Sequence, residues 1–86
     1  MKAKATAVKK RLSLAKGQLE GILKMVDDDR YCIDISNQIL SAIALLKNTN
    51  RIILKAHLEA CVKSGLGPEG ETKIDEIINI IDKIAN

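Results

Sequence analysis

The longest stretch of uninterrupted helix-forming sequence, residues 31–63, limits the folds open to this chain more than any other feature. It contains no glycine or proline, and its apolar residues recur at the three- and four-residue intervals of one helix face. A helix of this length is unusual in a small globular domain. A chain of 86 residues cannot cover so long a stripe alone, so we expect the helix to pack against a second copy of the chain. The stripe comprises Ile35, Ile39, Ala42, Ile43, Leu46, Ile53, Leu54 and Leu58, and Asn48, Thr49 and Asn50 weaken it in the middle.

An earlier helix is expected over residues 5–26. Its apolar residues are separated alternately by four and three positions, which is a heptad seam and requires a partner helix. Gly17 and Gly21 interrupt good helix formers at a cost of about 1 kcal/mol each. Both lie on one face of the helix, where a neighbouring backbone could come close. The seam consists of Val8, Leu12, Ala15, Leu19, Ile22 and Val26.

Residues typical of turns separate these two helices and predict a third helix after them. Asp27, Asp28 and Asp29 predict a short turn, because an aspartate caps a helix N-terminus well; the next helix would then start near Arg30. Glycines and a proline within residues 64–68 predict its end. A third apolar-periodic helix is expected over residues 71–84. The sequence therefore predicts an all-α fold, with residues 1–86 forming a single domain.

The composition favours an oligomer built from helices. Tyr31 is the only aromatic residue, and 47% of the chain is hydrophobic, so the core must be aliphatic. A chain this short often requires oligomerisation, a metal or disulfides for stability. We interpret the excess of apolar residues as a subunit interface, which makes a homodimer or homotetramer the expected state.

The charge is distributed unevenly along the chain. The net charge is +3, but residues 1–25 carry seven basic residues against Glu20 alone. A basic end on an otherwise acidic chain suits a polyanionic partner such as double-stranded DNA. A solvated helix face that keeps the protein soluble would give the same pattern, so charge alone leaves both interpretations open.

No segment predicts export or membrane insertion. The basic N-terminal stretch lacks the apolar region of a signal peptide, and no apolar run approaches the length of a membrane span. The cytoplasm is the expected compartment. There, two cysteines are thiols, metal ligands or redox groups more often than a structural disulfide.

His57, Cys61 and Cys32 form a candidate metal site that spans two subunits. His57 and Cys61 are four residues apart on one helix, so their side chains leave the same face. Cys32 precedes His57 by about 25 residues, or roughly 37 Å of continuous helix, and cannot reach it within one chain. Two antiparallel copies would bring Cys32 of one to His57 and Cys61 of the other, in two symmetric sites related by an axis near Leu45 and Leu46.

Two thiolates and one imidazole suit a soft ion of low coordination number, and Cu(I) fits best. Structural zinc normally has four protein ligands, although a water or carboxylate could complete a zinc site here. A redox pair is the main chemical alternative, because the same geometry could hold a disulfide or a persulfide bridge. No arrangement of catalytic residues is present within one chain, so an enzyme is not expected.

Several short motifs resemble the copper-sensitive operon repressor (CsoR) family. They are Arg11-Leu12, Gly17-Gln18 with Gly21-Ile22, Lys24-Met25, Tyr31-Cys32, Gln38-Ile39, and His57-Leu58 with Cys61-Val62. The resemblance covers nearly the whole chain. Its most specific part is the cysteine followed by the His-x-x-x-Cys pattern.

The resemblance implies a three-helix protomer that forms an antiparallel four-helix-bundle dimer, and a dimer of dimers. It implies a repressor that binds operator DNA without metal and is released by Cu(I) held by Cys32, His57 and Cys61. Tyr31 and Glu76 would support these ligands. The persulfide sensors of the family lack the histidine, and the nickel and cobalt sensors add histidines near the N-terminus, so copper is the expected signal. Copper buffering, or thiol or persulfide redox sensing without this operator function, is the alternative.

The DNA-binding face departs from the family pattern. The family commonly has basic residues at the positions of Ser13, Leu14, Glu20, Ile43 and Asn48. Basic residues stand nearby, and phosphate contacts dominate DNA affinity. The residues expected to contact DNA are Lys9, Lys10, Arg11, Lys16, Gln18, Lys47, Arg51 and Lys55.

Overall fold

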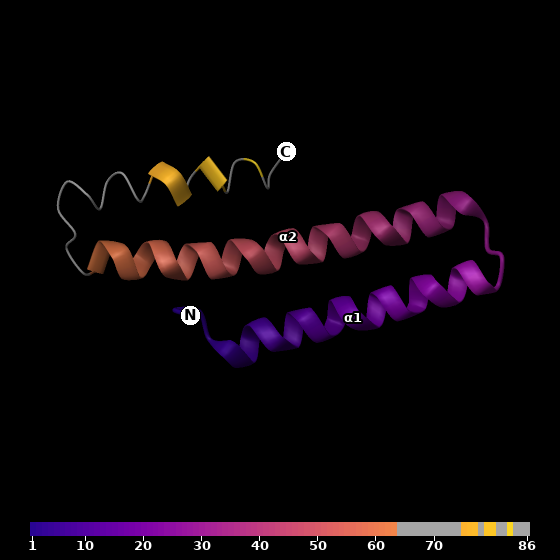
Figure 1. Cartoon of the computed structure of the whole chain (residues 1–86), viewed down its shortest axis with the longest axis horizontal. Helices are drawn as coiled ribbons and strands as arrows, with labels where there is room; N and C mark the ends of the chain where they lie inside the picture. The colour runs from indigo at the N-terminus through magenta and orange to yellow at the C-terminus, as the bar shows by residue number, and fades with distance from the viewer. Residues whose placement is uncertain (64–74, 78, 81–82, 84–86) are drawn as a thin grey trace.

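The computed structural model describes residues 1–63, 75–77, 79–80 and 83, and its main feature is a hairpin of two long helices (Figure 1). Helix α1 spans Ala5–Asp27, and helix α2 spans Cys32–Lys63 and runs antiparallel to it. The all-helical prediction and the bounds of both helices are thereby confirmed to within one residue. Residues 75–77, 79–80 and 83 are helical, as expected for the third helix. The rest of that helix and the predicted stop at 64–68 lie outside the described residues.

The protomer is a single layer of helices. The Cα atoms extend over 56 × 27 × 10 Å, and Figure 1 views this layer along its shortest axis. The described C-terminal residues lie beside α2 on the side away from α1. A layer one helix thick has two broad faces and almost no interior, so it cannot hide all of its apolar residues. None of the described helices is both long and apolar enough to cross a membrane.

Only half of the predicted α1 seam packs against α2. Val8, Ala15 and Ile22, which are seven residues apart, are buried. The intervening Leu12 and Leu19 are 46% and 51% exposed. The seam was predicted to require a partner helix, and within the protomer α2 covers only one side of it. The remaining side is open to a second partner.

Thr49 lies on the buried side of α2. The Asn48-Thr49-Asn50 segment was expected to weaken the buried stripe of α2, yet Thr49 is only 2% exposed and is the most deeply buried of the described residues. Its Oγ1 donates a hydrogen bond to the Leu45 carbonyl oxygen at 2.8 Å. That bond removes most of the cost of burying a hydroxyl.

The aspartates end α1 rather than capping α2. Asp28 is the C-cap of α1, and Asp29 has a positive φ of 52°. The Asp29 amide donates to the Val26 carbonyl oxygen at 3.1 Å, and the Arg30 amide donates to the Met25 carbonyl oxygen at 2.9 Å. These two bonds form a Schellman motif, in which the left-handed position is usually glycine.

Replacing Asp29 with glycine is expected to stabilise the protein. Glycine adopts φ near 52° without the steric cost of a Cβ, and this gain exceeds its larger loss of chain entropy by about 0.5–1 kcal/mol. Urea unfolding at fixed protein concentration would measure the difference in the free energy of unfolding. Asp29→Val is the matched control and should destabilise. A glycine variant less stable than the wild type would show that the aspartate side chain contributes more than the backbone strain costs.

Gly17 and Gly21 face open space in the described protomer. A Cβ placed on either glycine would meet no atom within 4 Å. Their spacing would allow a close backbone neighbour, but the described part of the protomer provides none.

Candidate metal centre and nucleic-acid interface

Helix α2 carries the predicted metal ligands at opposite ends. Cys32 is its first residue, and His57 and Cys61 lie in its last two turns. The helix is continuous from Cys32 to Lys63, so about 37 Å of helix separates Cys32 from His57. The structure thus brings none of these ligands from the two ends together within one protomer. Among the described side chains, which do not include that of Cys61, no three His, Cys, Asp or Glu residues are grouped.

The apolar residues of α2 form two stripes rather than one. Ala42 and Thr49 belong to the buried stripe. Ile39, Ile43 and Leu46 form a second stripe and are 44%, 41% and 41% exposed.

Two of the predicted ligands, Cys32 and His57, belong to the second, exposed stripe. Cys32 precedes Ile39 by seven residues, and His57 follows Ile43 by twice that interval, so helical spacing puts them on the same side of α2. Both side chains are exposed. Their exposure leaves them accessible to a metal ion or to a second subunit.

One set of exposed apolar residues from the two helices lies on the same broad face of the protomer. On each helix, members of this set follow buried residues by four positions: Leu12 follows Val8, and Leu46 follows Ala42. Because the two right-handed helices are antiparallel, the same offset turns both sets toward the same face. We call this the apolar face; its exposed members are Leu12, Leu19, Leu23, Ile39, Ile43 and Leu46. Exposed apolar residues that share one face of a molecule are typical of an interaction site.

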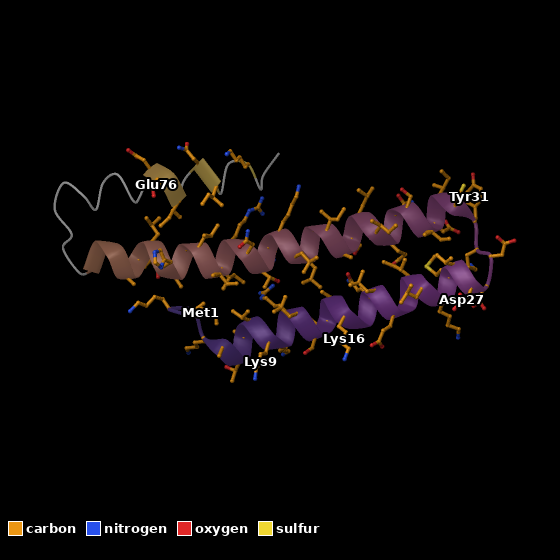
Figure 2. All side chains as sticks on the ribbon, in the orientation of Figure 1. Met1, Lys9, Lys16, Asp27, Tyr31 and Glu76 are labelled. Atoms are coloured by element: carbon orange, nitrogen blue, oxygen red, sulfur yellow. The ribbon has the colours of Figure 1, made fainter. Side chains whose placement is uncertain are left out.

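Tyr31 and Glu76 lie near opposite ends of α2 (Figure 2). Tyr31 is 65% exposed, and its carbonyl oxygen accepts the Ile35 amide at 3.2 Å, which places it at the start of α2. Glu76 is exposed and lies beside the C-terminal half of α2. Within one protomer, Tyr31 is therefore next to Cys32, and Glu76 is on the side of the molecule that carries His57.

The predicted DNA-binding residues of α1 form the α1 basic set, which consists of Lys9, Lys10, Arg11 and Lys16. Lys9 and Lys16 are exposed and project from α1 away from α2 (Figure 2). Lys10 and Arg11 line a shallow surface hollow with Ala7 and the exposed Leu14. Lys9 and Lys16 thus offer cations along the outer side of α1, whereas Arg11 is half-buried.

The basic residues of α2 point in another direction. Lys47, Arg51 and Lys55 form the α2 basic set, in which Lys47 is half-buried and the other two are exposed. Lys47 and Arg51 each lie two residues from the buried Thr49, which places them about 200° around the helix from it. The α2 basic set therefore lies on the side of α2 away from α1, and one protomer does not join the two sets into one patch.

Gln18 differs from the other predicted DNA-binding residues. It is half-buried, and its Oε1 atom is shielded from solvent without a hydrogen-bond partner among the described residues. A side chain in this position is less available to a nucleic acid than the lysines around it.

Two antiparallel helices thus leave an apolar face exposed, and α2 carries the candidate thiol and imidazole ligands. Residues 4–83 match the family described as "Metal-sensitive transcriptional repressor". The chain therefore belongs to the CsoR family of metal-sensitive transcriptional repressors, and it is a regulator rather than an enzyme. Membership of a repressor family implies operator DNA as a partner.

Curated relatives agree with this assignment. The chain is 37% identical over 79 residues to the copper-sensing transcriptional repressor CsoR of Mycobacterium ulcerans, covering 91% of this chain and 68% of that protein. It is 38% identical over 74 residues to the repressor of the same name from Bacillus subtilis, covering 85% of this chain and 73% of that protein.

Two solved structures share the fold. The copper-sensing repressor CsoR with Cu(I) from Geobacillus thermodenitrificans superposes with a TM-score of 0.70 at 33% identity, covering 94% of this chain and 85% of that one. The nickel-responsive transcriptional regulator InrS superposes with a TM-score of 0.78 at 22% identity, covering 98% of this chain and 96% of that one. At this low identity, the second likeness concerns the fold alone.

Proposed function

We propose that this protein is a Cu(I)-sensing transcriptional repressor that binds operator DNA in its metal-free form and is released when Cu(I) binds. The working unit is an antiparallel dimer, and dimers pair into a tetramer. Cys32 of one subunit and His57 and Cys61 of its partner hold the metal. The relatives named as copper-sensing support the choice of metal.

The observation that carries the proposal is the position of the ligands at both ends of the apolar face. Two copies of this face, related by a two-fold axis near Leu45 and Leu46, would cover each other's exposed leucines and isoleucines. The same rotation would bring the first turn of α2 against the last turns of the partner's α2. One interface thus buries the apolar face and assembles two three-ligand sites.

The donor set fits Cu(I) better than nickel. Two thiolates and one imidazole provide soft donors in low number, which Cu(I) prefers. Ni(II) would require more nitrogen or oxygen donors, and His57 is the only histidine of the chain. Tyr31 next to Cys32, and Glu76 on the His57 side, would both lie near one shared site in the antiparallel dimer. There they would orient the ligands.

The release of DNA on Cu(I) binding follows from the sharing of one metal site between two subunits. When bound, Cu(I) supplies a soft cation that both thiolates and the imidazole can share. Cys32 of one subunit is then held to His57 and Cys61 of the other, and this favours a tetramer shape that fits DNA less well. Both cysteine thiols lose their protons on binding, so metal uptake releases protons.

Fluorescence anisotropy of labelled DNA from upstream of the protein's own gene tests this function. Reduced, metal-free protein should bind the DNA, and one equivalent of Cu(I) per protomer should release it under anaerobic conditions. DNA binding that is unaffected by Cu(I) would overturn the proposal, as would release by Ni(II) but not by Cu(I).

His57→Ala should uncouple the metal from DNA. Two thiolates remain, so the variant should still take up Cu(I) nearly normally. Its DNA binding should no longer respond to Cu(I), because the two remaining thiolates would hold the ion without fixing the His57 turn of α2 against the partner. Chelator competition and DNA anisotropy on the same sample measure the two effects separately. Complete loss of Cu(I) uptake would show that the imidazole is required for affinity rather than for coupling.

The positions of the basic residues favour a second candidate function. It is copper buffering, or thiol or persulfide redox sensing, without operator binding. The two basic sets lie on different sides of the protomer, and Leu14, 55% exposed, and Glu20 stand where the family commonly has basic residues. Under this function, the protein would take up Cu(I), or form an intersubunit disulfide, and bind no DNA in either state.

A further inference from the structure

The outer side of α2, which points away from α1, changes from exposed to covered along the helix. Four residues spaced by seven share this side: Ile33, Leu40, Lys47 and Leu54. Ile33 and Leu40 are 52% and 59% exposed, whereas the two that follow are half-buried. Because α1 packs on the opposite side of α2, another part of the chain must cover the outer side from Lys47 onward.

The C-terminal segment, which is described over residues 75–77, 79–80 and 83, lies where this cover is needed. It runs beside the C-terminal half of α2, on the side away from α1 (Figure 1). Ile77 is only 7% exposed, whereas Ile80 on the same segment is 44% exposed. Ile77 is therefore the described side chain that anchors the segment, and Ile80 is not required for the anchoring.

The covered side of α2 is also the side that carries the α2 basic set. Lys47 is one of the half-buried residues there, and Arg51 and Lys55 follow it at intervals of one helical turn. A helix with its side chains is about 10–12 Å across, so DNA that approaches the outer side of α2 meets the C-terminal segment first. The segment presents Asp75 and Glu76, both exposed, and carboxylates repel phosphates. Full contact between the α2 basic set and DNA therefore requires the segment to leave this side.

We propose that the C-terminal segment restrains DNA binding by occupying the outer side of α2, a role that rests on the operator function proposed above. While docked through Ile77, the segment shields the α2 basic set. DNA makes its full set of phosphate contacts only with molecules whose segment has undocked. The apparent affinity for DNA is then the intrinsic affinity multiplied by the undocked fraction.

Ile77→Asp tests this restraint, because a carboxylate cannot be buried at the anchor position without a large desolvation cost. Anisotropy of labelled DNA from upstream of the protein's own gene, measured on reduced, metal-free protein, should show an affinity about fivefold to hundredfold higher than that of the wild type. The salt dependence should become steeper by about one for each additional phosphate that is neutralised. Ile80→Asp is the matched control, because it adds the same charge at an exposed position of the same segment, and it should not raise the affinity.

Two further variants separate the effect from misfolding and assign it to the α2 basic set. Ile77→Ala shortens the anchor without adding a charge, and it should raise the affinity in the same direction by a smaller factor. In a background that carries Lys47→Ala, Arg51→Ala and Lys55→Ala, Ile77→Asp should no longer raise the affinity, because the cations that it uncovers are gone. Circular dichroism should show that each variant keeps the helix content of α1 and α2.

The outcomes distinguish this role from the proposed function. If neither the wild type nor Ile77→Asp binds the DNA, the operator function fails and the restraint fails with it. If the wild type binds DNA and Cu(I) releases it, while Ile77→Asp binds no more tightly than Ile80→Asp, the restraint is overturned and the operator function stands. A gain that persists without the three α2 cations would also overturn the restraint, because the segment would then act on another surface.

Discussion

Mixing the Cys32→Ser and Cys61→Ser variants should restore Cu(I) binding that neither variant has alone. In a mixed dimer, one site combines both substitutions and is lost. The other site receives Cys32 from the Cys61→Ser subunit and receives His57 and Cys61 from the Cys32→Ser subunit, so it is intact. An equal mixture that exchanges subunits at random should recover about one intact site per four protomers. A site built within one protomer could not be rescued in this way.

Chelator competition under reducing, anaerobic conditions measures this rescue. The variants are mixed in mild denaturant, refolded together and compared with each variant taken alone through the same procedure. A mixture of Cys32→Ser with a Cys32→Ser,Cys61→Ser double variant is the matched control, because none of its dimers contains an intact site. Equal Cu(I) uptake by the rescue mixture and this control would contradict the shared site.

The helices could be predicted from the sequence because their boundaries depend on local chemistry. The absence of glycine and proline from residues 31–63 predicts one continuous helix, and α2 spans Cys32–Lys63. The three aspartates predicted a break, which the structure confirms. Their role was assigned to the wrong helix, however, because an aspartate suits both an N-cap and a left-handed C-terminal position. Only the backbone path, with φ of 52° at Asp29, distinguishes the two.

The division of the apolar residues between two partners could not be predicted from periodicity. A heptad pattern shows which residues share a side of a helix, but not which of them meets the neighbour in the same chain. Leu12 and Val8 therefore appeared equivalent, yet one is exposed and the other buried. The buried position of Thr49 was missed for a related reason, because only the polarity of its side chain was considered. Its seven-residue spacing from Ala42 was the signal that could have placed it on the buried side.

The candidate metal site is predicted from the distance between its residues along one helix. Sequence reasoning described it in more detail than any other part of the protein. Counting residues along a continuous helix shows that Cys32 cannot meet His57 in one chain, and the continuity of α2 supplies the premise of that count. The exposed stripe that joins these residues adds a surface on which two copies could meet. The fold does not identify the ion, because the nickel-responsive regulator InrS has the same fold. The proposal of Cu(I) depends on the donor atoms instead.

Removing the α2 basic set should weaken DNA binding far more than removing an equal charge elsewhere. A variant with Lys47→Ala, Arg51→Ala and Lys55→Ala loses three cations spaced one helical turn apart. If each neutralises a phosphate, affinity for operator DNA should fall about 10²–10³-fold at moderate salt. The slope of log K against log salt should become shallower by about one for each phosphate that is no longer neutralised. Cu(I) affinity should stay unchanged, because these residues lie on the side of α2 away from α1, outside the apolar face.

The salt slope makes the result specific to phosphate binding rather than to net charge. The control variant Lys2→Ala,Lys24→Ala,Lys83→Ala removes the same charge at three exposed positions outside both basic sets, and it should leave the slope nearly unchanged. If the α2 variant and the control lose affinity equally, DNA responds to the overall charge and α2 has no DNA-binding surface. If only substitution of Lys9, Lys10 and Lys16 lowers the slope, the DNA lies along α1. In that case the exposed Leu14 would lie at the interface, where a cation would otherwise meet the phosphates.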